Sequence, residues 1–204
     1  MTKPRKSLIL ASASPRREAL LAQIGVTADR IIAPDVDETA RPRELPAAYA
    51  KRIAREKAAL VAASEPLAAV LAADTVVACG RRILPKAADE SDARACLELL
   101  SGRAHRVMTA VCLIADGRRA ERLVETRVVF KRLSAREISA YLAGGEWRGK
   151  AGGYAIQGQA AIFVRLLTGS YSGVVGLPLF ETASLLAGAG LECGGTPLSG
   201  PRGN

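Results

Sequence analysis

The stretch "LILASASPRREALLAQIG", residues 8–25, predicts a strand, a tight turn and a helix in immediate succession. Leu8–Ala11 is a short apolar run that reads as a strand. Ser14 is a good N-cap residue, and Pro15 suits the first position of a helix. An apolar stripe follows at helical spacing, and Gly25 ends it. The chain is therefore expected to leave a strand, pass through a serine-rich turn and enter a helix at once.

Two arginines, Arg16 and Arg17, lie at the start of this helix, where the helix dipole favours acidic side chains. The turn before them supplies free backbone N–H groups and the hydroxyls of Ser12 and Ser14. Helix N-termini bind phosphates through such N–H groups, and a guanidinium adds bidentate hydrogen bonds. The stretch therefore indicates an anion site. The alternative, that both arginines are solvated surface charges, stays open at this point.

Beyond residue 25 the sequence alternates between strand and helix patterns. The predicted segments are a helix from Pro46 to about Ala63, a strand in 67–80, a hairpin return in 80–90, a helix at Ser91–Leu100, a hairpin at 105–133 turning at Asp116-Gly117, a helix at 134–145 opened by a Ser134/Glu137 capping box, a glycine-dense loop at 144–161, a strand at 162–169 and a helix at 176–191. This order predicts an α/β fold with a mixed β-sheet flanked by helices. We expect one domain over residues 1–192 and a disordered tail over 193–204.

The composition limits the classes of partner. The 204 residues are 49% hydrophobic and carry a formal net charge of +9, which favours polyanionic partners. Aromatic residues make up only 4%, the basic residues are dispersed, and no RNP, zinc-finger or helix-turn-helix signature is present. We therefore expect no stable nucleic-acid complex, whereas nucleotides and polyphosphates remain candidates.

The cysteines and the N-terminus indicate a cytoplasmic protein. The four cysteines are isolated in the sequence, without metal-ligand spacing, and read as small core residues in a reducing compartment. The apolar part of "MTKPRKSLIL" is too short for a signal peptide, and no run reaches transmembrane length. We expect no membrane association.

Two charged residues interrupt apolar patterns. Asp74 breaks the run "AVLAADTVV", and a carboxylate in such a strand must be partnered or shift its pKa upward. The alternative is a structural aspartate satisfied by backbone amides. Lys57 lies between Ile53 and Val61 on the apolar face of its helix, so we expect its ammonium to reach into the protein. The alternative is that it snorkels to solvent.

A divalent cation could join two of the acidic residues. Glu38 closes the acidic turn "PDVDET", which is otherwise typical of a solvated loop. Mg²⁺ is normally held by one or two carboxylates together with phosphate oxygens, so Glu38 and Asp74 could share one ion. The same phosphates could then be held by the cationic side chains of Arg16, Arg17, Lys57 and Lys86.

Missing motifs narrow the chemistry. The single histidine, His105, lies at a basic strand entry and is interpreted as structural. No GxxxxGK[ST] or GxGxxG motif is present, so P-loop and Rossmann sites are not expected. What remains is metal-assisted attack of water on a polyphosphate, with a carboxylate to orient or deprotonate the water.

Several stretches, in order along the chain, resemble the signature motifs of the Maf proteins. The sequence "LASASPRREALL" at residues 10–21 matches their pattern Ser-x-Ser-Pro-Arg-Arg-x-x-Leu-Leu. The others are "APDVDE" at 33–38, "AREKA" at 54–58, "AADTVV" at 72–77, "LSGRAHRVMTAV" at 100–111, "KAGGYAIQG" at 150–158 and "GSYSGVVGLPL" at 169–179. The resemblance covers residues 7 to about 190.

This resemblance implies a fold and a reaction. It implies a mixed α/β structure with two lobes around a central cleft, like that of inosine triphosphatase. It further implies a nucleoside triphosphate pyrophosphatase that releases the monophosphate and pyrophosphate, uses Mg²⁺ or Mn²⁺, and has a housecleaning role. The "KAGGYAIQG" loop resembles the branch that acts on dTTP and UTP.

The resemblance also assigns roles by motif. Asp74 becomes the catalytic carboxylate and, with Glu38, a metal ligand. The residues implied in substrate binding are Ser12, Arg16, Arg17, Lys57, Lys86, Thr75 and Gln157. The sequence departs from the family pattern at Ala87, where proline is frequent, and at Ser172-Gly173 in "SYSG".

Two other functions remain open, as does a homodimer. One is a non-enzymatic nucleotide- or nucleic-acid-binding regulator of septum formation, since an excess of basic residues suits either class. Against it, a pure anion binder gains nothing from a buried carboxylate beside phosphates unless a metal joins them. The other is a pyrophosphatase for 7-methyl-GTP.

Overall fold

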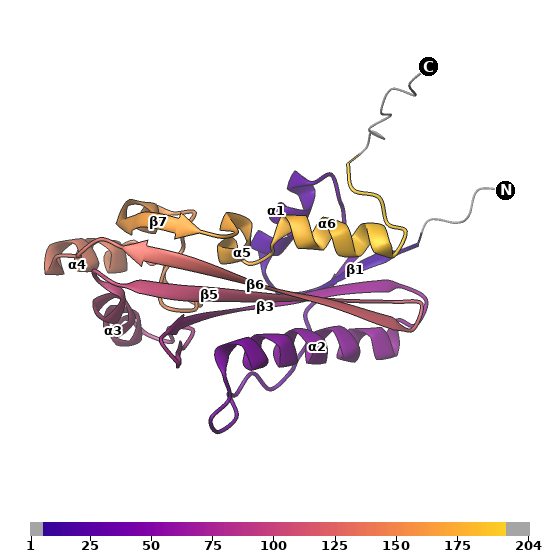
Figure 1. Ribbon diagram of the computed structural model, residues 1–204, viewed down its shortest axis with the longest axis horizontal. Coiled ribbons are helices and arrows are strands. Elements are labelled where there is room, and N and C mark those ends of the chain that lie inside the picture. Colours follow the sequence, from indigo (N-terminus) through magenta and orange to yellow (C-terminus); the bar gives the residue numbers. More distant parts are fainter. Residues whose placement is uncertain (1–5, 195–204) are drawn as a thin grey trace, which may run out of the picture.

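The computed structural model describes residues 6–194, which form one mixed β-sheet covered by helices on both faces (Figure 1). The strands are β1 (Leu8–Ala11), β2 (Arg30–Ile32), β3 (Ala69–Cys79), β4 (Arg82–Leu84), β5 (Ala104–Ala115), β6 (Arg118–Phe130) and β7 (Val164–Thr168). The helices are α1 (Pro15–Gln23), α2 (Pro46–Ser64), α3 (Glu90–Leu100), α4 (Ala135–Ala143), the 3-10 helix η1 (Gln159–Phe163), α5 (Tyr171–Val175) and α6 (Leu179–Gly188). The mixed α/β architecture predicted from the sequence is confirmed.

The sheet has the strand order β2-β1-β3-β5-β6-β7, and β4 pairs with the far end of β3. The pairs β1–β2 and β1–β3 are parallel, because α1 and α2 provide the crossovers that parallel strands need. The remaining pairs are antiparallel. The long β5–β6 hairpin turns at Asp116 and Gly117, whose φ values of 52° and 69° suit a tight hairpin turn.

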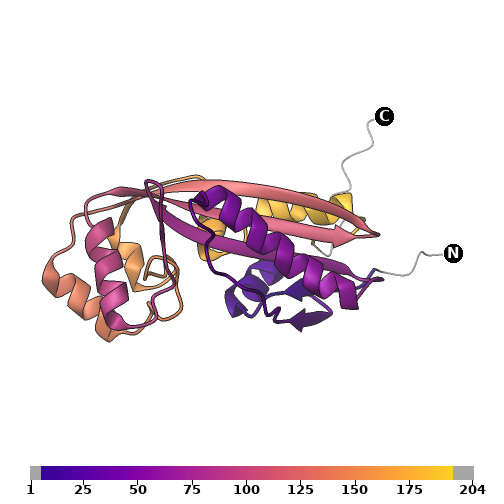
Figure 2. The same ribbon diagram turned by 90° about the horizontal axis from the view of Figure 1, so that it is seen from below.

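Two lobes share the long strands β3, β5 and β6. In the first lobe, α2 covers one face of the sheet, while α1, α5 and α6 lie on the other (Figure 1). In the second lobe, α3, α4 and η1 gather at the opposite end of the strands around a separate core that contains Trp147 and Phe163 (Figure 2). The two-lobed arrangement implied by the resemblance is therefore present.

The predicted elements agree with the structure except at some boundaries. The predicted strand at 162–169 begins later, because 159–163 is the 3-10 helix η1. The helix expected at 176–191 is Leu179–Gly188, and the separate helix α5 before it was not predicted. The helix expected from Ser91 begins at Glu90, because Asp89 accepts a hydrogen bond from the Asp92 amide as its N-cap.

The capping predictions had mixed outcomes. The Ser134/Glu137 box is present at the start of α4. Ser14 precedes α1 as expected, but its side chain makes no capping hydrogen bond; its own amide donates to Ser12 Oγ instead. Of the tail expected at 193–204, residues 195–204 lie outside the described part of the chain, and Cys193 and Gly194 belong to no helix or strand.

The register of the sheet leaves a gap beside β3. Strand β1 pairs with β3 as far as Ala72, and β4 begins to pair at Val77. Within residues 6–194, no strand therefore pairs with 73–76 along this edge of β3. Side chains alternate along a strand, so Asp74 shares the face covered by α2, and Thr75 lies on the face covered by α5. Both faces become accessible at this gap.

Candidate active site

A cavity of about 310 Å³ lies at this gap, between the two lobes. From the first lobe, the end of β1, the start of α1 and one side chain of α2 line the cavity. From the second lobe, the loops at Lys86 and 149–157 line it. All nine residues singled out from the sequence line it: Ser12, Arg16, Arg17, Glu38, Lys57, Asp74, Thr75, Lys86 and Gln157. Residues far apart in the sequence are thus brought together as expected, whereas their individual roles stay predictions.

Asp74 and Lys57 form a buried ion pair at the cavity. Lys57 Nζ lies 2.8 Å from Asp74 Oδ1 and 2.6 Å from Glu38 Oε1. The Lys57 side chain is only 8% exposed, so the prediction that its ammonium reaches into the protein is confirmed, and snorkelling to solvent is excluded. The Asp74 carboxylate is therefore partnered by this ammonium. The alternative, in which backbone amides alone satisfy Asp74, did not include this charged partner.

Glu38 connects this pair to a second lysine. Its carboxylate accepts hydrogen bonds from Lys57 and from Lys86, which comes from the loop after β4. Burial acts to raise the pKa of Glu38, but the hydrogen bonds from the two lysines outweigh it and lower the pKa. Glu38 therefore stays ionised at neutral pH and carries negative charge beside Asp74.

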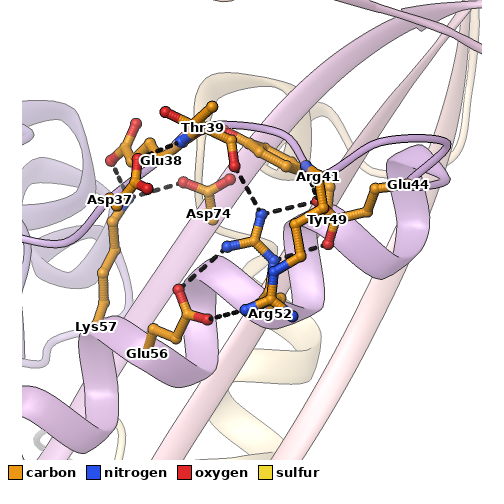
Figure 3. A network of polar contacts seen from close by, with 10 residues as sticks. All are labelled: Asp37, Glu38, Thr39, Arg41, Glu44, Tyr49, Arg52, Glu56, Lys57 and Asp74. Atoms are coloured by element: carbon orange, nitrogen blue, oxygen red, sulfur yellow. Dashed lines mark hydrogen bonds and ion pairs between the residues drawn. The ribbon is translucent and has the colours of Figure 1, made fainter.

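A polar network holds the loop that carries Glu38, as Figure 3 shows. The Arg52 guanidinium donates two hydrogen bonds of 2.7 Å to the Glu44 carboxylate and one of 3.0 Å to the Thr39 carbonyl. Tyr49 donates its hydroxyl to the Glu38 carbonyl at 2.9 Å. Burial, with Asp74 and Glu38 nearby, raises the pKa of Tyr49 to about 12, so the hydroxyl remains a donor. Side chains of α2 thus fix the backbone at Glu38 and at the residue after it.

The opposite wall is the serine-rich turn and the first turn of α1. Arg17 Nη1 donates to Ser12 Oγ at 3.1 Å, and the Ser14 amide donates to the same oxygen at 3.1 Å. Because these two bonds use the acceptor capacity of the Ser12 hydroxyl, its own proton is the group that can donate to a ligand. The turn therefore presents hydrogen-bond donors to the cavity.

The two arginines have internal partners that the sequence did not reveal. Arg17 Nε donates to the Gly176 carbonyl at 2.9 Å, and Arg16 Nε donates to the Val175 carbonyl at 3.4 Å. Gly176 reaches this position with a φ of 142°, which L side chains rarely adopt. The end of α5 thus orients both guanidiniums. Each has five N–H donors, so further donors remain for an anion.

The loop with Gln157 forms the third wall. Gln157 is exposed, and no hydrogen bond among residues 6–194 holds its amide. Tyr154, three residues earlier, is buried and makes a 2.8 Å hydrogen bond to His105 Nε2. His105 is 2% exposed and lies outside the cavity lining, in agreement with a structural role.

The glycines of this loop serve packing. A Cβ at Gly152 would lie 2.9 Å from Val77 Cγ1, and a Cβ at Gly153 would lie 3.1 Å from Ala93 Cα. Both have positive φ, so they let the loop approach β3 and α3 closely. At these two positions the close neighbours are Val77 and Ala93.

The two departures from the family pattern have clear local structures. Ala87 is buried and donates its amide to the Lys150 carbonyl at 3.3 Å, and Lys86 forms an isolated bridge with Ala151. This pairing ties the Lys86 loop to the Gln157 loop. The Ser172 hydroxyl accepts from the Leu179 amide at 3.1 Å, which joins α5 to α6.

Two functional candidates were missed in the sequence. Lys150 lines the cavity, where burial and then the nearby Arg16 lower its pKa. The one feature of the sequence that could have indicated this role is that Lys150 begins the stretch "KAGGYAIQG". Thr109 contacts Thr75 from behind the cavity, and nothing in the β5 sequence distinguishes it from an ordinary buried threonine.

The carboxylates that could hold a metal are Glu38 and Asp74. Both approach the same ammonium nitrogen, so one small cation could reach both. Within residues 6–194, no group of three or more His, Cys, Asp or Glu side chains is placed as a metal site. Two carboxylates completed by phosphate oxygens are the donors that Mg²⁺ usually takes, so the residues present fit such an ion.

Comparison with known proteins identifies the family. The sequence profile of the family described as "Maf-like protein" matches residues 7–189. A protein of Rhodospirillum rubrum named dTTP/UTP pyrophosphatase is 62% identical over 194 residues, which cover 95% of this chain and 92% of the relative. A protein of the same name from Caulobacter vibrioides is 62% identical over 185 residues, or 90% of this chain and 96% of the relative. The chain belongs to the Maf family.

Among solved structures, a HAM1 protein from Coxiella burnetii aligns with a TM-score of 0.49 and 17% identity. The alignment covers 90% of this chain and 100% of that protein. No helix in residues 6–194 has the length and apolar character needed to cross a membrane.

Proposed function

We propose that this chain is a nucleoside triphosphate pyrophosphatase that hydrolyses dTTP and UTP to the monophosphate and pyrophosphate. The observation that carries the proposal is the cavity itself, where the Asp74–Lys57–Glu38 cluster faces Arg16 and Arg17. Such a site pairs a carboxylate that can act on water with cations that can hold a triphosphate. The relatives named dTTP/UTP pyrophosphatase support the choice of substrate.

The proposed roles follow from the donors and acceptors of each side chain. The guanidiniums of Arg16 and Arg17 and the hydroxyl of Ser12 bind the phosphates that leave as pyrophosphate. Lys57 and Lys86 balance the negative charge of the carboxylates and the substrate. Asp74 orients a water molecule toward the α-phosphorus and accepts its proton. The water oxygen bonds to that phosphorus as the bond to the bridging oxygen breaks.

The proposed cofactor is Mg²⁺ or Mn²⁺, with Glu38 and Asp74 as protein ligands. A bound cation would polarise phosphate oxygens and stabilise the charge that develops in the transition state. In the protein alone, Lys57 supplies positive charge between the same two carboxylates.

The proposed base selectivity rests on Gln157, with Thr75 as a second contact at the substrate. Uracil and thymine present an N3–H donor beside an O4 acceptor, and a side-chain amide can pair with both groups. Cytosine presents the reverse order. The Gln157 amide has no internal partner among the described residues, so selectivity against cytosine requires that a neighbouring group fix the amide orientation when the nucleotide binds.

The test is a panel of dTTP, UTP, CTP, ATP, GTP and 7-methyl-GTP, each with Mg²⁺ or Mn²⁺, with identification of the products. We expect monophosphate and pyrophosphate from dTTP and UTP. A preference for 7-methyl-GTP would favour the other pyrophosphatase candidate. Nucleotide binding without hydrolysis would favour the regulator of septum formation. Release of orthophosphate and nucleoside diphosphate would overturn the proposed bond cleavage.

We propose a cytoplasmic protein whose partner is its nucleotide substrate. The four cysteines are free thiols, as expected in a reducing compartment: Cys79, Cys96, Cys112 and Cys193.

A further inference from the structure

A line of hydrogen bonds runs from the cavity to α5 along the face of the sheet that α5 covers. Arg17 Nη2 lies 3.5 Å from Thr75 Oγ1, which lies 3.0 Å from Thr109 Oγ1. Thr109 Oγ1 in turn donates to the Gly173 carbonyl at 2.7 Å. Arg17 and Thr75 line the cavity, whereas Thr109 lies behind it on β5. The line therefore connects the cavity with the middle of α5.

The two ends of this line fix the direction of every hydrogen bond in it. A guanidinium can only donate, and a carbonyl oxygen can only accept. The Thr109 hydroxyl donates its one proton to the Gly173 carbonyl, so it is the acceptor in the hydrogen bond with Thr75. Thr75 consequently donates to Thr109 and offers only lone pairs to Arg17 and to the cavity.

Thr109 is placed for this role by the register of the sheet. It lies directly opposite Thr75 in the β3–β5 ladder, where cross-strand side chains are close enough to interact. Its side chain is buried, with 1% of the residue exposed. Valine has nearly the same shape and would fill the same space. What only threonine or serine supplies at this position is the hydroxyl.

The segment that Thr109 holds also orients both arginines. After Gly173, the carbonyls of Val175 and Gly176 accept hydrogen bonds from Arg16 Nε and Arg17 Nε. At the start of α5, the Ser170 amide donates to Thr126 Oγ1 at 3.0 Å. Buried threonines of two neighbouring strands thus anchor this short helix to the sheet.

We propose that Thr109 is a positioning residue for the phosphate-binding site, acting through Thr75 and α5 on the two arginines. The proposal rests on the proposed function and deepens it. Without the hydroxyl, the buried Gly173 carbonyl loses its donor and the Thr75 proton loses its acceptor. The Thr75 proton can then turn toward the cavity, and α5 loses one of its anchors to the sheet. Both changes misalign the donors of Arg17.

The test compares Thr109→Val with Thr182→Val. Thr182 is a second buried threonine, 0% exposed, and its hydroxyl has no hydrogen-bond partner among residues 6–194. At Thr109 the substitution therefore removes a hydroxyl that makes hydrogen bonds, whereas at Thr182 it removes a hydroxyl that makes none within residues 6–194. Thr109→Ser keeps the hydroxyl and serves as the rescue variant. The readouts are KM and kcat for dTTP, and binding of inorganic pyrophosphate by calorimetry.

We expect Thr109→Val to weaken pyrophosphate binding by about 10-fold and to lower kcat/KM by about 10- to 100-fold, the scale of small misplacements in a site. The loss should fall mainly on KM, because the arginines hold the phosphates before and during the reaction. Thr182→Val and Thr109→Ser should stay within about threefold of the wild type, since both leave the Thr109 hydrogen bonds possible.

A folded Thr109→Val protein with wild-type binding and kinetics would overturn the proposal, as would equal losses in Thr109→Val and Thr109→Ser. If Thr109→Val does not fold, Thr109→Cys takes its place, because a thiol fills the site but is a weak donor and acceptor. Pyrophosphate binding separates this proposal from the proposed function. A wild-type protein without dTTP or UTP hydrolysis would refute the function, while the binding comparison would still test Thr109.

Discussion

Lys57 and Asp74 form an ion pair that is almost completely removed from water, with Nζ 2.8 Å from Oδ1 and side-chain exposures of 8% and 5%. Burying two charges costs several kcal/mol per ion before their attraction offsets it, and apolar replacements often stabilise a protein equally well. Stability alone therefore does not explain the pair. The pair lies at the cavity, where β3 lacks a neighbour, and this place fits the proposed role of Asp74, in which the carboxylate acts on a bound triphosphate.

Asp74→Asn should lower turnover of dTTP by about 10²-fold or more while the protein remains folded, because an amide cannot accept the proton of the attacking water. Lys57 keeps its bond to Glu38 in this variant, so the ammonium is not left unpaired. The measurement is steady-state kinetics together with circular dichroism. Asp35→Asn, an exposed change in the nearby acidic turn, is the control and should be silent.

A folded Asp74→Asn protein that turns over dTTP at nearly the wild-type rate would remove Asp74 from the reaction. Unfolding of this variant, with Asp35→Asn intact, would instead assign Asp74 a structural role. The kinetics and the circular dichroism thus separate the two interpretations.

Lys57→Met should reduce the free energy of unfolding by about 3 kcal/mol, because it leaves two carboxylates facing each other without the shared cation. Adding Mg²⁺ should restore part of the loss if Glu38 and Asp74 are metal ligands. The measurement is urea unfolding with and without Mg²⁺, and Lys51→Met on the same helix is the control. A Lys57→Met protein whose unfolding midpoint ignores Mg²⁺ and Mn²⁺ would count against these two residues as the metal site.

Gln157 should set the base preference. We expect dTTP and UTP to be the best substrates and purine triphosphates to be slower by about 10²-fold or more, because a mismatched base leaves polar groups unpaired. Both sugars should be accepted. Competition assays with paired nucleotides measure the ratio of kcat/KM directly. If Gln157→Ala keeps the full pyrimidine preference, the discrimination lies in other residues, with Thr75 the next to test.

His105 should make the second lobe sensitive to acid. Burial lowers the pKa of His105 to about 4, from an ordinary value near 6.5. Between these values the unfolded chain binds the proton and the folded chain does not. The contribution of neutral His105 to the free energy of unfolding is thus complete above pH 6.5. It is lost as the pH falls toward 4, by about 3 kcal/mol in total.

The measurement for His105 is the free energy of unfolding between pH 7 and pH 4, compared with His105→Gln. Glutamine stays neutral over this range and can still hydrogen-bond to the Tyr154 hydroxyl. The difference between the two proteins should therefore shrink or reverse in favour of the variant at low pH. Parallel curves for the two proteins would contradict a neutral, buried His105.

Much of the fold could be predicted because local rules and long-range packing agree. Pro15 and Pro46 begin helices as expected, and Asp116-Gly117 forms the hairpin turn. The side chains that broke an apolar pattern, Lys57 and Asp74, were also the informative ones. Each needs a charged partner when buried, and each proved to be the partner of the other.

What could not be predicted depends on contacts between distant segments. Helix α5 is one short turn capped by Ser170 and anchored to Thr109 and Thr126, and no hydrophobic period marks it. The carbonyls that orient the arginines are backbone atoms, so residue types cannot reveal them. The position of Lys150 likewise follows from the bridge between Lys86 and Ala151, which joins loops about 65 residues apart.

The most direct test of the central claim is the hydrolysis of dTTP in water enriched in oxygen-18, followed by ³¹P NMR of the products. If Asp74 directs water to the α-phosphorus, dTMP and pyrophosphate form in equal amounts, and the label appears in dTMP alone. Label in the pyrophosphate would place the attack at the β-phosphorus, and dTDP with labelled orthophosphate would place it at the γ-phosphorus. Either result would contradict the assignment of Asp74 and the arginines made here.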